Sequence, residues 1–185
     1  MGQEFDGYQL FTIKELKLET DLNSDVIERN PWMANVEIQA ELKSACLKIH
    51  EPKKSKIANV AITTRKMGNL FLQKYCKEHH TERLRTLSAA DSAALATAEV
   101  LDAFLATDEW PLRLVAEIAQ VELFSSLKIL HLMESAGAIE RADRTETVRH
   151  WCLTNEALHR EWKSEYFNFF KENPPDAQSA KSQSS

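Results

Sequence analysis

Apolar residues recur every three or four positions through much of the second half of the chain, which is the spacing of helices with one buried face. This spacing predicts three helices, at residues 88–106, 112–120 and 125–136. Ser88 and Asp91 are suitable N-caps for the first helix, and Pro111 suits the first turn of the second. Gly137 stands where helices often end in a left-handed conformation.

The first half of the chain gives a less regular pattern. Helical spacing predicts one helix near residues 57–64 and another at about residues 69–85. By contrast, the apolar residues of segment 36–42 alternate strictly with polar ones, which is the period of a half-buried strand. We therefore predict a strand there. Residues 13–18 fit the start of either a helix or a strand.

A β hairpin is expected after Gly137. Residues 139–141 are short and extended in character, residues 142–147 suit a polar turn, and residues 148–153 are rich in β-forming side chains. A last helix is predicted at residues 155–171, followed by a polar, disordered tail. The predicted fold class is mainly α with a small β hairpin, with an N-terminal half that is α or α+β.

The composition agrees with such a fold. The chain has 185 residues, 43% of them hydrophobic and 28% charged, with only 4 glycines and 5 prolines. Few glycines argue against a β-sandwich or a Gly-rich nucleotide fold, which need many tight turns. The acidic N-terminus is unlike a signal peptide, no uncharged run is long enough to span a bilayer, and three scattered cysteines fit a reducing compartment. We expect a cytoplasmic protein without a membrane partner.

The net charge of -5 conceals a strong pattern along the chain. Residues 1–30 carry -4, residues 31–89 carry +6, residues 90–110 carry -5 and residues 111–185 carry -2. A basic middle between acidic flanks is either an anion-binding face or a mixed solvated surface. Phe71 and Tyr75 lie among the basic residues of this middle, where they either stack on nucleic acid or pack in the core.

Three segments of the second half follow one another in a recognisable order. They are AEIA at residues 116–119, ILHLMESAGAIER at residues 129–141 and RHWCLT at residues 149–154. Together they resemble the winged helix-turn-helix domain of MarR- and IclR-like regulators, and the resemblance covers about residues 94–158. It implies that residues 125–136 form a recognition helix in the DNA major groove, and that the hairpin after this helix contacts phosphates.

The resemblance also implies which side chains contact DNA. Those of the expected recognition helix and hairpin are Ser125, Ser126, Lys128, His131, Arg141, Arg144 and Arg149. Arg65 and Lys66 are added from the basic middle, where residues 57–67 resemble a phage-repressor helix-turn-helix without its turn glycine. These nine residues are the predicted DNA-binding set.

Cys76, His79 and His80 are the closest approach to a metal or thiol site. Structural zinc sites have four ligands, and no second pair follows at zinc spacing. A thiolate nucleophile needs a group that orients its base, and the sequence offers none. We therefore expect no catalytic residue, no metal, no cofactor and no enzymatic activity; a small thiol- or metal-dependent enzyme is the third alternative.

The leading hypothesis is a sequence-specific transcriptional regulator that binds double-stranded DNA as a homodimer. The alternative is an adaptor or assembly subunit whose winged helix contacts a protein partner, which the overall acidity favours. Aromatic residues of the last helix, such as Phe167 and Phe170, either pack in the core or form the dimer contact. The expected organisation is an N-terminal region of uncertain fold at residues 1–88, a winged domain at residues 89–172 and a tail at residues 173–185.

Overall fold

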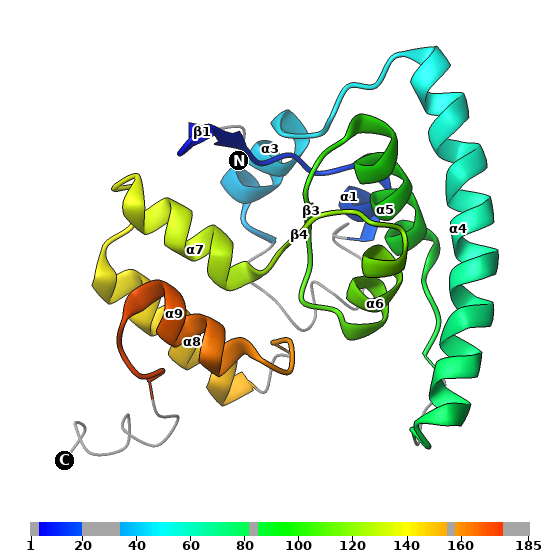
Figure 1. Ribbon diagram of the computed structural model, residues 1–185. Helices are drawn as coiled ribbons and strands as arrows, with labels where there is room; N and C mark the ends of the chain where they lie inside the picture. The colour runs from blue at the N-terminus through cyan, green and yellow to red at the C-terminus, as the bar shows by residue number, and fades with distance from the viewer. Residues whose placement is uncertain (1–3, 20–33, 82–84, 155–157, 176–185) are drawn as a thin grey trace.

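The computed structural model describes residues 4–19, 34–81, 85–154 and 158–175. Over these residues the protein is mainly helical with a small antiparallel hairpin, which confirms the fold class at this level (Figure 1). The hairpin lies at the N-terminus, where β1 (Glu4–Phe5) pairs with β2 (Tyr8–Gln9). Asp6 and Gly7 form its turn with φ of 50° and 79°, a pair of positive values that two-residue hairpin turns favour.

The prediction of a strand at residues 36–42 is wrong, because this segment belongs to α3 (Val36–Ser44). The side chain of Asn35 caps the helix by accepting hydrogen bonds from two backbone N–H groups of the first turn. Val36 is 82% exposed, so the alternating pattern does not correspond to a buried strand face. Alanine, glutamate and lysine in this segment favour a helix once the cap is present. A shorter helix, α1 (Lys14–Glu19), lies earlier in the chain.

A single helix of 28 residues, α4 (Glu51–Glu78), occupies the middle of the chain. The prediction of two helices here is wrong, as is the helix-turn-helix suggested for residues 57–67, because α4 continues through Gly68. A Cβ at Gly68 would lie 3.0 Å from side-chain atoms of Leu87 and Val115. The glycine therefore allows close packing of α4 rather than ending the helix. α4 packs mainly on α5 (Ala89–Leu101).

The three helices predicted after residue 88 are present, but the first ends at Leu101 rather than at residue 106, because Asp102 takes a left-handed conformation and Leu105–Ala106 form a strand. Ser88 caps α5 through a capping box with Asp91, and Gly137 has a φ of 70° after the third helix. After α5 the chain forms, in order, β3 (Leu105–Ala106), α6 (Trp110–Ile118), β4 (Leu123–Phe124) and α7 (Ser126–Ser135). β3 and β4 pair in parallel, so the connection that leads into α6 lies beside the one that leads into α7.

The predicted strand at residues 148–153 and the turn expected at residues 142–147 are wrong, because α8 (Arg141–Thr154) contains both. The helix begins at the last residue of the extended segment expected before the turn. Arg144, Val148 and Trp151 follow at intervals of four and three, which places them on one side of a helix, and all three are buried or half-buried. This packing outweighs the β preference of the segment. Residues 139–153 therefore form no hairpin, and the arginines expected in a wing lie on a helix.

The last described helix is α9 (Trp162–Phe170), shorter than the helix predicted at residues 155–171. Residues 155–157 of that prediction lie outside the described chain, as do residues 176–185 of the predicted tail. Lys171 ends α9 in a left-handed conformation with φ of 55°. No helix within the described ranges is long and apolar enough to cross a bilayer.

Two groups of buried side chains form the core. The first joins α1, α4, α5, α6 and the short β3–β4 pair around Leu72, Leu95 and Ala116. The second joins α7, α8 and α9 around Leu127 and Tyr166. The boundary expected near residue 88 falls within the first group, where α4 packs on α5. α7 begins the second group and follows directly on β4, which belongs to the first.

Candidate nucleic-acid interface

α4 concentrates positive charge on its exposed surface. Residues 52–77, nearly the whole helix, contain seven basic and no acidic side chains. All seven are exposed, and we call them the basic face of α4: Lys53, Lys54, Lys56, Arg65, Lys66, Lys74 and Lys77. Among described residues, acidic partners occur only at the helix ends, where Lys54 pairs with Glu51 at 2.6 Å and Lys74 with Glu78 at 3.8 Å.

The same surface of α4 also exposes apolar side chains. Ile62, Met67 and Leu70 are 69%, 59% and 54% exposed. Lys66, Leu70 and Lys74 follow at intervals of four, so charge and apolar surface alternate along one line of the helix. Figure 1 shows α4 at the edge of the molecule, with the other elements against one side of it. The helix can therefore meet a large partner along its length.

Ser125 and Ser126 form hydrogen bonds that stabilise the start of α7. Ser125 is 2% exposed, and its hydroxyl caps the helix by accepting a hydrogen bond of 2.9 Å from the backbone N–H of Lys128. The backbone N–H of Ser126 donates to the Asp108 carboxylate at 3.1 Å. A serine directly before a helix is a typical N-cap, a role that the sequence analysis did not assign to Ser125.

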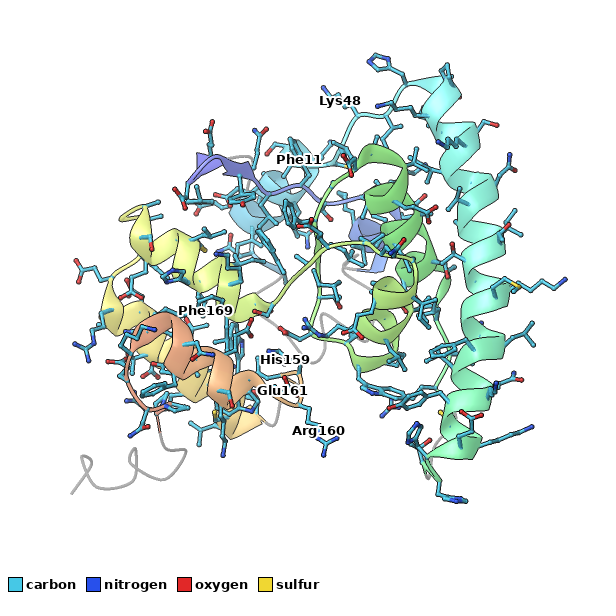
Figure 2. The ribbon with its side chains drawn as sticks, in the orientation of Figure 1. Phe11, Lys48, His159, Arg160, Glu161 and Phe169 are labelled. Carbon is cyan, nitrogen blue, oxygen red and sulfur yellow. The ribbon has the colours of Figure 1, made fainter. Side chains whose placement is uncertain are left out.

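Lys128 and His131 lie beneath aromatic residues of α9. The Lys128 ammonium is 5.4 Å from the ring centroid of Phe169 and 5.9 Å from that of Phe124. The imidazole of His131 stacks on Phe169 at 5.0 Å and meets the edge of Phe170 at 5.7 Å. Figure 2 shows Phe169 between α7 and α9. α9 therefore packs on the part of α7 that the resemblance directs at DNA.

Arg144 is the centre of an ion-pair cluster that joins α7, α8 and the end of α9. Its side chain is 2% exposed and lies 3.0 Å from Glu134 and 2.8 Å from Glu172. It also donates to the Tyr166 hydroxyl at 3.0 Å, and its guanidinium lies 4.0 Å from the ring centroid of Phe170. Arg141 pairs with the second oxygen of Glu172. We call Glu134, Arg141, Arg144, Tyr166 and Glu172 the C-terminal cluster.

The cluster and its neighbours change three ionisation equilibria. Burial raises the pKa of Glu172, but the hydrogen bond from Tyr166 and the charges of Arg144 and Arg141 outweigh it, so the pKa lies below its ordinary value. Burial and the hydrogen bond to Glu172 raise the pKa of Tyr166 to about 12. Burial and the charge of Lys128 lower the pKa of His131. Glu172 is therefore an ionised acceptor, and His131 favours the neutral form.

The predicted DNA-binding residues thus lie in two separate regions of the structure. Lys128, His131, Arg141 and Arg144 all contact one segment, residues 166–172, and Arg149 pairs with Glu146 on α8. Arg65 and Lys66 lie apart on α4 and are exposed. Sequence reasoning missed Glu172, because an acid 28 positions after Arg144 gives no local signal of pairing.

A hollow of about 470 Å³ lies between α6 and the start of α9. His159 pairs with Glu165 at 2.5 Å beside it, and Figure 2 shows His159, Arg160 and Glu161 at this end of α9. Its lining mixes two arginines with three glutamates, namely Arg113, Arg160, Glu117, Glu161 and Glu165. This balance of charge selects neither anions nor cations.

The cysteine and histidines at the end of α4 do not form a compact cluster. Cys76 is buried, whereas His79 and His80 are exposed, and His79 stacks on Tyr75 with ring centroids 4.1 Å apart. No group of three or more histidine, cysteine, aspartate or glutamate side chains suitable for a metal ion occurs in the described parts of the chain.

Comparison of the chain with protein-family models, with curated proteins and with solved structures gives no match. The resemblance to winged helix-turn-helix regulators therefore rests on the residues quoted for it. Function is therefore inferred from two regions of the molecule, the basic face of α4 and the charge-balanced C-terminal cluster.

Proposed function

We propose that the protein is a DNA-binding regulator that holds double-stranded DNA through the basic face of α4. The observation that carries this proposal is the run of seven exposed basic side chains without an intervening acid over residues 52–77. At 1.5 Å per residue this run is about 39 Å long, comparable with the ~34 Å of one DNA turn. DNA presents a phosphate charge roughly every 1.7 Å along its axis, so several lysines can each find a phosphate.

The distribution of the remaining charge supports DNA rather than indiscriminate polyanion binding. The basic face contributes +7, which leaves -12 on the rest of a chain whose total is -5. An acidic remainder repels nucleic acid except where α4 faces it, and so orients the encounter. The helices α5, α6 and α7 follow in the order that the resemblance to winged regulators implies, although residues 149–154 belong to α8 and form no wing strand. The homodimer stays a prediction.

Binding of a labelled duplex of about 30 base pairs across a salt series tests the proposal. The triple variant Lys66→Gln/Lys74→Gln/Lys77→Gln should weaken binding and reduce the slope of log affinity against log salt by up to about 2.7, or 0.9 for each lost phosphate contact. Its matched control is Lys43→Gln/Lys48→Gln/Lys163→Gln, which removes the same charge from exposed positions elsewhere. Equal effects of the two triples, or absence of binding at low salt, would overturn DNA binding by α4.

An adaptor that binds an acidic protein is the second candidate, because Ile62, Met67 and Leu70 expose apolar surface among the lysines. DNA phosphates gain little from such side chains, whereas a protein interface buries them. The variant Ile62→Ser/Leu70→Ser should leave duplex affinity unchanged if DNA is the partner. The adaptor gains support if wild-type protein fails to bind duplex at low salt.

A further inference from the structure

The C-terminal cluster holds a carboxylate in the way that proteins hold a phosphate. One oxygen of Glu172 lies 2.8 Å from Arg144 and accepts a hydrogen bond of 3.0 Å from Tyr166, and the other oxygen pairs with Arg141. Two guanidiniums and a phenol therefore converge on a single anionic group. Guanidinium groups match phosphate oxygens as well as carboxylate oxygens, since both present paired acceptors.

We propose that Arg141, Arg144 and Tyr166 form a DNA-phosphate site that the chain's own Glu172 occupies, so that residues 169–172 are an autoinhibitory cover over α7 and α8. This inference rests on the proposed function, because it gives the same DNA a second contact. The cover is the segment that also carries Phe169 and Phe170.

The donors of this site are positioned without Glu172. Glu134 lies 3.0 Å from Arg144 and comes from α7, so this ion pair does not depend on the cover. With Glu172 in place, two arginines balance two glutamates; without it, the site carries one net positive charge. A phosphate supplies the missing negative charge and at least as many acceptor oxygens.

Solvent reaches the site at Arg141 and Glu172, whereas Arg144 and Tyr166 are buried, so an external phosphate meets Arg141 first. The side chains of Glu172 and Arg141 are 23% and 73% exposed. Glu172 follows the left-handed Lys171 that ends α9, so Glu172 itself can leave without a break in the helix. Phe169 and Phe170 belong to the last turn of α9 and move only if that turn unwinds. Hollows of about 510 Å³ and 990 Å³ flank the cluster, one beside His131 and Phe170 and the other beside Arg149 and Asn173.

Departure of Glu172 affects α7 because the aromatic residues that contact α7 lie directly before Glu172 in the chain. Phe169 and Phe170 lie two and three residues before Glu172, and they contact Lys128, His131 and Arg144. Movement of the last turn of α9 therefore exposes those side chains together. A phosphate bound at Arg141 would be coupled to the exposure of Lys128 and His131, two residues of the predicted recognition helix.

The full-length variant Glu172→Gln tests the inference, because it removes the charge and keeps the size of the side chain. We expect tighter binding of the duplex and a salt slope steeper by about 0.9 to 1.8, corresponding to one or two further phosphates. The control is Glu161→Gln, which removes an exposed acid at the other end of α9 and should bind like wild type. Unchanged duplex affinity of Glu172→Gln would overturn the inference.

Two further measurements guard against a folding artefact and separate phosphate sources. Adding the exposed substitution Arg141→Gln to Glu172→Gln should cancel the gain, whereas a persistent gain contradicts the site. In wild-type protein, duplex should speed amide exchange at residues 169–172, and unchanged or slower exchange contradicts release of the cover. If inorganic phosphate abolishes the gain and sodium chloride of equal ionic strength does not, the site also takes free phosphate. Failure of the proposed function differs, since wild-type protein then binds no duplex at all.

Discussion

The basic face of α4 and the arginines of α8 look alike in the sequence, yet they have opposite surroundings in the structure. Arg65 and Lys66 are exposed, with no acid between residues 52 and 77. Arg144 is 2% exposed and contacts Glu134 and Glu172, which lie 10 and 28 positions away. On a helix, the acids that neutralise an exposed base are usually three or four residues away, and α4 has them only at its two ends, where Glu51 pairs with Lys54 and Glu78 with Lys74. The charge pattern along the sequence therefore predicts the exposed basic surface of α4 correctly. It does not predict the burial of Arg144 on α8, because the acids that pair with it come from other elements.

The largest expected difference between the two regions is in how much the loss of an arginine lowers the free energy of unfolding. Arg144→Ala leaves two partly buried carboxylates without their partner and should lower the free energy of unfolding by about 3–5 kcal/mol. Arg65→Ala removes an exposed side chain and should change it by no more than about 0.5 kcal/mol. Urea denaturation followed by circular dichroism measures both. Equal midpoints for the two variants would show that Arg144 is not the anchor of α7, α8 and α9.

A smaller effect tests how α4 presents its basic face. Gly68→Ala adds a Cβ at 3.0 Å from Leu87 and Val115, an overpacking that typically costs about 1–3 kcal/mol. Alanine also favours a helix over glycine by about 1 kcal/mol, so the expected net loss is on the order of 1 kcal/mol. Thermal unfolding measures it, and Val115→Ala in the same chain should restore part of the loss. A stabilising Gly68→Ala would indicate that α4 lies farther from α6.

The parts of the fold that the sequence predicted are those with local causes. Ser88 and Asp91 form a capping box, and Gly137 takes a left-handed conformation after α7, and each acts within a few residues of itself. The errors came from packing between distant segments. α8 was mistaken for β structure because its β-forming residues are buried by α7 and α9, and no pattern within residues 139–153 indicates those neighbours.

The candidate site likewise has one part that the sequence predicts and one part that depends on packing between distant segments. An uninterrupted basic run on one helix is visible in the sequence, and its exposure in α4 agrees with that pattern. The environment of Lys128 and His131 depends on where α9 packs, and therefore on Phe169 and Phe170 some forty residues later. Phe170 was expected to pack in the core or to form a dimer contact, but the sequence does not specify the helix that it contacts, and it did not single out Phe169.

The smallest expected effect is a difference in acid sensitivity between the two regions. Burial lowers the pKa of His131 below its ordinary 6.5, so the unfolded chain binds a proton more readily than the folded one. Stability should therefore fall as the pH drops below about 6.5. The pKa of Glu172 is also lowered, and its contribution, present above its ordinary 4.5, is lost as the pH falls through the folded value. Both changes weaken the packing of α9 on α7 in acid, in two separate pH ranges.

Amide exchange at residues 166–172 should accelerate first near pH 6 and again below pH 4.5, while exchange in α4 stays constant relative to its intrinsic rate. His131→Gln should remove the first step and Glu172→Gln the second. An α4 that loosens over the same ranges would mean that the two regions respond to acid as one unit.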